Sequence, residues 1–265
     1  MFRRIPEFIV GAWIVATAIL VATINMQSTF VFDPPNLALV LQIVFIAGGY
    51  SLVAYIAGVS FSKTGSPIFL LIGAAQIAAA TGSTIAYFDL SNANFAATMH
   101  NSGFFLSSVL QVSSAGLALT NRAQPSRSGN PTLKVGLVYA AVLAAASVLV
   151  VATLQGVTPA FFVKGVGGTP LRQSILVSTI VLFSVASVVF FKLYRDSHSV
   201  TFYWYCLALA LIADGFVAYL LTRQSGDPMT WLGRLSFYLS GVYFLALVVT
   251  SMRPTTKVGA VSSPA

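Results

Sequence analysis

The sequence predicts an all-α polytopic membrane protein, a helical bundle with eight transmembrane helices and both termini in the cytoplasm. Of its 265 residues, 57% are hydrophobic and only 8% are charged, whereas soluble domains carry about 25% charged residues. Apolar runs long enough to cross a bilayer recur along the whole chain, which leaves no stretch for a soluble domain. The basic residues concentrate in the connections on one side, as they do in oriented membrane proteins.

Eight apolar segments are predicted to be the helices: 8–26, 36–60, 67–88, 98–121, 134–155, 172–192, 201–222 and 229–252. The first follows Arg3 and Arg4 and resembles a signal peptide. It continues for about 18 residues without a small-x-small cleavage site, which predicts a retained helix. Proline stands at or just before several helix starts, including Pro67, Pro131 and Pro228, where its missing N–H costs little.

The fourth segment is the most polar of the eight, with His100, Asn101, Gln111 and several serines. Such a helix must turn its polar face toward other helices rather than toward lipid, which predicts a place near the centre of the bundle. Glutamine occurs once in each of three segments, as Gln42, Gln76 and Gln111, and we expect these amides to bond between helices.

The distribution of positive charge predicts the orientation. With the N-terminus inside, three basic residues face the outer side: Lys164, Arg172 and Arg223. Ten face the inner side: Arg3, Arg4, Lys63, Arg122, Arg127, Lys134, Lys192, Arg195, Arg253 and Lys257. This bias predicts a multi-pass protein of the cell (inner, cytoplasmic) membrane. Residues 1–253 are predicted to form the single transmembrane domain, and 254–265 a short disordered cytoplasmic tail.

Two ionisable residues fall inside predicted spans, Asp214 in the seventh and Arg234 in the eighth. Both lie about 9–12 Å below the outer surface at ~1.5 Å per residue, so a pair between the two helices is geometrically reasonable. Intramembrane charges either satisfy each other structurally or mark a functional site. Both interpretations stay open from the sequence.

His100 and Asn101 begin the fourth helix on the same outer side and can complete a polar ligand-binding pocket with Asp214 and Arg234. A histidine at a helix end is alternatively an interfacial or hydrogen-bonded residue. The outer loop 156–172 carries Phe161, Phe162 and Lys164 beside several glycines. It is either a lid over that pocket or a loop anchored by its aromatic residues at the interface.

Several classes of function are disfavoured by what the sequence lacks. The five lysines fall in loops or at helix ends, which argues against a retinal Schiff base. Two histidines in unrelated positions argue against a haem ligated by two histidines. No cluster has metal-ligand spacing, few carboxylates are placed for acid–base chemistry, and the basic residues form no nucleic-acid surface. We therefore expect no enzyme, no cofactor, no metal and no nucleic acid.

Three stretches together resemble a known family: the sequence HNSGFF at 100–105, the loop GVTPAFFVKGVGGTPLR at 156–172, and GDPMTWLGRLSFYLSGVYFLALV at 226–248. They look like the membrane-associated sensor domains, of the third type, that precede bacterial and archaeal histidine kinases and diguanylate cyclases. The resemblance covers mainly the second half of the chain. It implies a module that senses a ligand and passes the change through its last helix to a cytoplasmic output domain.

The leading hypothesis is a non-enzymatic, sensor-like membrane module that binds a small or lipidic ligand in the outer polar pocket. Only a short tail follows Arg253, so we expect either that a separate signalling output protein carries the output domain or that the chain is a truncated or repurposed sensor module. The alternative is an accessory or structural subunit of a larger membrane protein complex, packed through pairs of small residues such as Ala78 with Gly82 and Gly103 with Ser107. A transporter is a third class, and it needs an inner polar path that the sequence does not provide.

Overall fold

A computed structural model of the chain describes residues 5–23, 31–120, 129–163, 166–222 and 226–251. In these ranges the regular secondary structure is helical except for one small hairpin. The elements are α1 (Ile5–Thr23), α2 (Pro35–Leu41), the π-helix η2 (Gln42–Gly48), α3 (Gly49–Thr64), α4 (Pro67–Ile85), α5 (Ala93–Leu119), α6 (Pro131–Leu154), β1 (Phe162–Val163), β2 (Gly167–Gly168), α7 (Pro170–Ser197), α8 (Val200–Leu221) and α9 (Pro228–Ser251).

Seven described helical segments are long and apolar enough to cross a membrane. One of them, Asn36–Thr64, is a continuous helix made of α2, the π-helical turn and α3. The predicted first segment is also helical, but its apolar stretch, Pro6–Ile19, is shorter than a full span. The prediction of a multi-pass helical membrane protein is confirmed at this level.

Helix boundaries differ from the prediction where capping residues extend the apolar run. Helix α5 begins at Ala93, five residues earlier than predicted, because the Asn92 side chain accepts the N–H of Phe95. Helix α7 begins at Pro170, because the Thr169 side chain accepts the N–H of Arg172. These side chains satisfy N–H groups that a helix start leaves without intrahelical partners.

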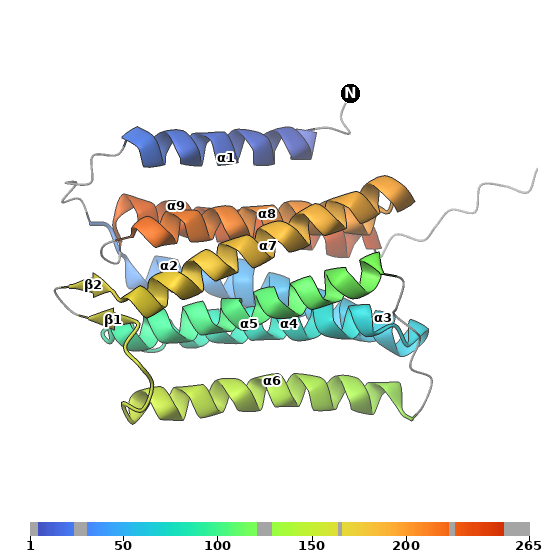
Figure 1. The fold of residues 1–265 in the computed structure, drawn as a ribbon, viewed down its shortest axis with the longest axis horizontal. Helices are drawn as coiled ribbons and strands as arrows, with labels where there is room; N and C mark the ends of the chain where they lie inside the picture. The colour runs from blue at the N-terminus through green and yellow to red at the C-terminus, as the bar shows by residue number, and fades with distance from the viewer. Residues whose placement is uncertain (1–4, 24–30, 121–128, 164–165, 223–225, 252–265) are drawn as a thin grey trace, which may run out of the picture.

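The helices run lengthwise beside one another, with α1 and α6 on opposite outer edges of the bundle (Figure 1). Helices α8 and α9 are the most buried of the spans, whereas the apolar window of α6 has no buried residue. The polar face of α5 is buried, including Ser107, Ser108 and Gln111, as predicted for a central helix. The hairpin of β1 and β2 caps one end of the bundle, which we call the hairpin end (Figure 1).

Amides bond between helices as the sequence predicts. Gln42 Nε2 donates to Ser83 Oγ at 2.5 Å and joins the π-helix to α4. Gln76 Nε2 donates to the Tyr205 hydroxyl at 3.2 Å, and that hydroxyl donates to Gln111 Oε1 at 2.7 Å. The second set links three helices, α4, α5 and α8, through one tyrosine.

Candidate functional site

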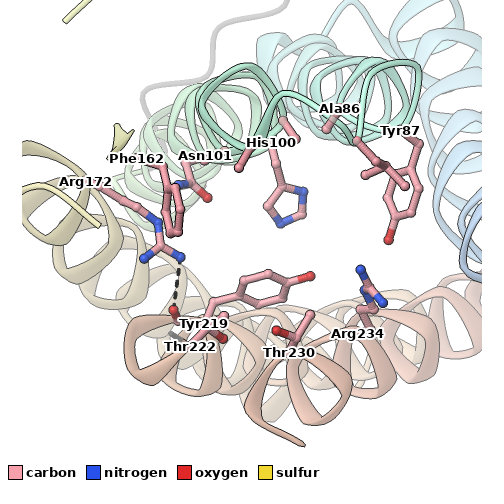
Figure 2. A pocket seen from close by; sticks show the side chains of 14 residues that line it. Ala86, Tyr87, His100, Asn101, Phe162, Arg172, Tyr219, Thr222, Thr230 and Arg234 are labelled. Carbon is pink, nitrogen blue, oxygen red and sulfur yellow. Dashed lines mark hydrogen bonds between the residues drawn. The ribbon is translucent and has the colours of Figure 1, made fainter. Parts of the chain in front are cut away.

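A pocket of about 130 Å³ lies at the hairpin end. Its walls come from the connection between α4 and α5, from α5 itself, from β1, and from the adjoining ends of α7, α8 and α9. One wall is apolar and made largely of alanine, whereas the other side chains are polar, charged or aromatic. Figure 2 shows two arginines, Arg172 and Arg234, on opposite sides of the His100 ring. Three of the four residues predicted to bind a ligand line this pocket: His100, Asn101 and Arg234.

Arg234 does not pair with Asp214, and the sequence-based pairing is wrong. Its Nη1 donates to Asp33 Oδ1 at 2.8 Å, and Asp33 precedes α2. The guanidinium also lies over the ring of Trp231, 5.1 Å from the centroid, and 6.0 Å from the centroid of the Tyr87 ring. Asp33 lies in the polar turn before the second predicted helix, a place where a carboxylate needs no intramembrane partner. Only the fold brings it to Arg234.

Asp214 is buried but does not line the pocket. Its Oδ2 accepts hydrogen bonds from Thr17 at 3.1 Å and from Ser236 at 2.9 Å. Trp13 Nε1 donates to the same Ser236 hydroxyl at 2.8 Å. Asp214 therefore belongs to a polar cluster that attaches α1 to α8 and α9, and the structure removes it from the predicted ligand-binding set.

Arg172 is the site residue that sequence reasoning missed. It is only 4% exposed. Its Nη2 donates to the backbone carbonyl of Tyr219 at 3.2 Å, while Nε and Nη1 have no hydrogen-bond partner. The positive-inside count treated Arg172 as an outer-loop charge. The sequence Thr169-Pro170 was the available signal, because a capping threonine followed by proline begins a helix and places Arg172 in its first turn.

His100 stands among aromatic rings at the base of the pocket. Its ring centroid lies 4.9 Å from that of Phe104, 5.2 Å from Tyr219 and 5.5 Å from Phe237. Its Nδ1 is hydrogen-bonded to Ser83 Oγ at 3.2 Å, and Nε2 has no partner. His100 therefore combines the two roles predicted from the sequence, because one ring nitrogen is hydrogen-bonded and the ring also lines the pocket.

The predicted lid loop divides into separate parts. Phe161 is 5% exposed and its N–H donates to Asn94 Oδ1 at 2.8 Å, so it anchors the loop to α5. Phe162 is the residue that lines the pocket. Lys164 lies outside the described residues.

Cationic and phenolic side chains line the pocket. Burial raises the pKa of Tyr87, in the connection after α4, above its ordinary value, which keeps this phenol neutral. The described residues contain no group of three or more His, Cys, Asp or Glu side chains placed to hold a metal ion. Comparison with protein-family models, with curated proteins and with solved structures finds no match for this chain.

Proposed function

We propose that the protein is a non-enzymatic, sensor-like membrane module that binds a small or lipidic ligand in the pocket at the hairpin end. The observation that carries this proposal is the convergence of Arg172, Arg234, His100 and Asn101 on one cavity inside an apolar bundle. Polar and charged groups within a membrane domain are expensive, and they are typical of sites that bind something. An apolar wall with a few convergent polar groups is also the usual form of a ligand pocket.

The same proposal places α1 as an eighth span and both termini in the cytoplasm, which makes the hairpin end the outer end. Its support is the distribution of basic residues, ten inside against three outside. The membrane is then the cell membrane, and the pocket lies at the level of the outer leaflet.

Ligand binding would be relayed through α9 and through the π-helix. Helix α9 contributes Arg234 to the pocket and runs to the opposite end of the bundle (Figure 1). A hydrogen-bonded chain from His100 through Ser83 to Gln42 reaches η2, whose Phe45 carbonyl lies against Gly241 of α9. Single π-helical turns inside α-helices occur frequently at functional sites. The change would be received by a signalling output domain.

A variant that fills the pocket without removing a polar group tests ligand binding. Ala97 lines the apolar wall, so Ala97→Leu occupies part of the space, and Ala144→Leu on the exposed side of α6 is the matched control. Each protein would be purified from its native membrane, and the small molecules that co-purify with it would be extracted and identified by mass spectrometry. We expect a molecule that remains with the wild type and the control and is lost from Ala97→Leu. Equal retention by all three proteins contradicts the pocket.

The relay is tested by a spin-label distance at the opposite end of the bundle. Labels on Val200 and Val249, both exposed, would report the separation of α8 and α9 in a background where Cys206 is replaced by serine. The distance should differ between wild type and Ala97→Leu. The alternative function, an accessory subunit, is supported instead if the chain purifies only within a larger complex and the distance is the same in both proteins.

A further inference from the structure

The unpartnered side-chain nitrogens in this pocket point to the class of ligand. These are Nε and Nη1 of Arg172, Nε2 of His100 and Nδ2 of Asn101. The guanidinium and the carboxamide nitrogens can only donate. Buried donors without acceptors are rare in folded proteins, so each of these atoms calls for a partner that brings oxygen acceptors.

The hydrogen bonds behind His100 allow its unpartnered nitrogen to donate as well. Gln42 Nε2 donates to Ser83 Oγ, and the Ser83 hydroxyl has its own proton available to donate to His100 Nδ1. A neutral imidazole that accepts at Nδ1 carries its proton at Nε2. In this tautomer His100 offers an N–H to the pocket. Figure 2 shows this ring between the two arginines.

The charge of Arg172 is not neutralised by a direct ion pair. Arg234 is paired with Asp33, whereas Arg172 forms no ion pair with any described carboxylate. Asp227 attracts Arg172 through space, but its Oδ1 accepts the N–H and the hydroxyl of Thr230 at the start of α9. A buried arginine without a paired anion is costly in a protein interior. A bound anion removes that cost.

We propose that the ligand is a small organic anion whose charged oxygens are bound by Arg172, with His100 and Asn101 as further donors. This inference rests on the proposed function. The volume of about 130 Å³ is close to the roughly 150 Å³ of an engineered cavity that holds benzene. The part of the ligand that the pocket encloses is therefore about the size of one six-membered ring. The anionic group can belong to a free molecule or to the headgroup of a lipid.

The hairpin is built to lie close against Arg172. A Cβ on Gly168 would lie 2.6 Å from Arg172 Nη1 and 3.1 Å from its Cδ. Residue 168 must therefore be glycine if the guanidinium is to keep this position beneath the strand. The glycine at 168 thus leaves room for the guanidinium that would contact the ligand.

Three small probes of similar shape but different charge test whether the pocket selects its ligand by charge. Benzoate, benzamide and benzylamine would be titrated into the purified full chain in phosphatidylcholine nanodiscs, with the thermal unfolding midpoint as the readout. We expect benzoate to raise the midpoint by several degrees and the neutral and cationic probes to leave it unchanged. A second preparation with phosphatidylglycerol in the nanodisc distinguishes the sources. If the lipid headgroup is the ligand, this lipid raises the midpoint and benzoate adds nothing.

Arg172→Met provides the decisive variant, and Arg195→Gln, exposed near the end of the same helix, is its control. If Arg172 binds an anion, Arg172→Met loses the response to benzoate or phosphatidylglycerol and is more stable than wild type without a ligand. A structural role through Tyr219 predicts the opposite, a lower midpoint without ligand. Arg172→Lys keeps a charge and should retain a weaker response, which guards against a variant that fails to fold.

Equal responses to benzoate and benzamide, or a response that Arg172→Met retains, overturn the anion inference. The anion inference is also overturned if the molecule that co-purifies with the wild type, and not with Ala97→Leu, is neutral. In that case the proposed ligand pocket stands. If no small molecule co-purifies with the wild type and no probe shifts its unfolding midpoint, the proposed pocket itself is contradicted. The two proposals thus fail in distinguishable ways.

Discussion

Asp33 and Arg234 join two parts of the chain that lie 201 residues apart, with 2.8 Å between Asp33 Oδ1 and Arg234 Nη1. The carboxylate side chain is 23% exposed and the guanidinium side chain 5%. Next to this pair, the N–H of Phe32 donates to the Gly226 carbonyl at 2.9 Å, and Trp231 Nε1 donates to the carbonyl of Phe32. The segment before α2 is therefore fastened across the start of α9, beside the pocket.

Asp33→Asn should lower the free energy of unfolding by about 3 kcal/mol, because it leaves the Arg234 charge in a buried position without its carboxylate. Unfolding in mixed detergent micelles measures the change, and Asp196→Asn, exposed near the end of α7, is the control. The double variant Asp33→Asn/Arg234→Gln should lose less than the sum of the two single variants. Strict additivity would show that the pair contributes nothing.

Asp214→Ala should loosen α1 while leaving the rest of the bundle folded. The variant removes the acceptor of Thr17 and Ser236, and the contact of α1 with α8 depends on this cluster. Amide hydrogen exchange should rise in α1 and stay unchanged in α4 and α5. Ser147→Ala on the exposed side of α6 is the control. Unchanged exchange in α1 would mean that its apolar contacts alone hold the helix.

Apolar run length and charge placement predicted the helical membrane bundle, because these properties are local and read directly from composition. The polar character of α5 likewise predicted its central place, which its buried serines and Gln111 confirm. The residues that these side chains contact in the folded protein were harder to predict from the sequence. Asp214 and Arg234 occupy matching depths on neighbouring helices, yet Asp214 turns to hydroxyls from α1 and α9 while Arg234 turns to Asp33. Depth along a helix does not fix the direction in which a side chain points.

The residues that line the candidate pocket were predicted only in part, because the sequence does not give the direction in which each side chain points. His100, Asn101 and Arg234 meet in one pocket, and Phe162 of the predicted lid lines it as well. Arg172 was missed because its helix was expected to begin at that residue, which made the side chain an interfacial charge. A start only two residues earlier, at Pro170, places it in the first helical turn and buries it.

Gly103→Ala should destabilise the contact of α4 with α5. A Cβ at this position would lie 2.8 Å from the Ala78 carbonyl oxygen and 2.8 Å from the Gly82 Cα. Forcing two backbones apart costs about 1–3 kcal/mol, and unfolding in mixed micelles measures it. Gly116→Ala in the same helix meets nothing within 4 Å and should be neutral or slightly stabilising. Equal effects of the two substitutions would rule out close packing as the cause. These small residues serve packing within the chain.

Tyr205→Phe should lower the free energy of unfolding by about 1–3 kcal/mol, because one hydroxyl serves two buried glutamines. Gln76 Nε2 would lose its acceptor and Gln111 Oε1 its donor, and both side chains are buried. Tyr55→Phe, on a side chain that is 68% exposed, is the control and should change stability little. Replacing both glutamines by leucine in the Tyr205→Phe background should recover part of the loss, because no buried polar group is then left without a partner. Failure of that triple variant to recover stability would show that packing around the ring, rather than hydrogen bonding, sets the contribution of Tyr205.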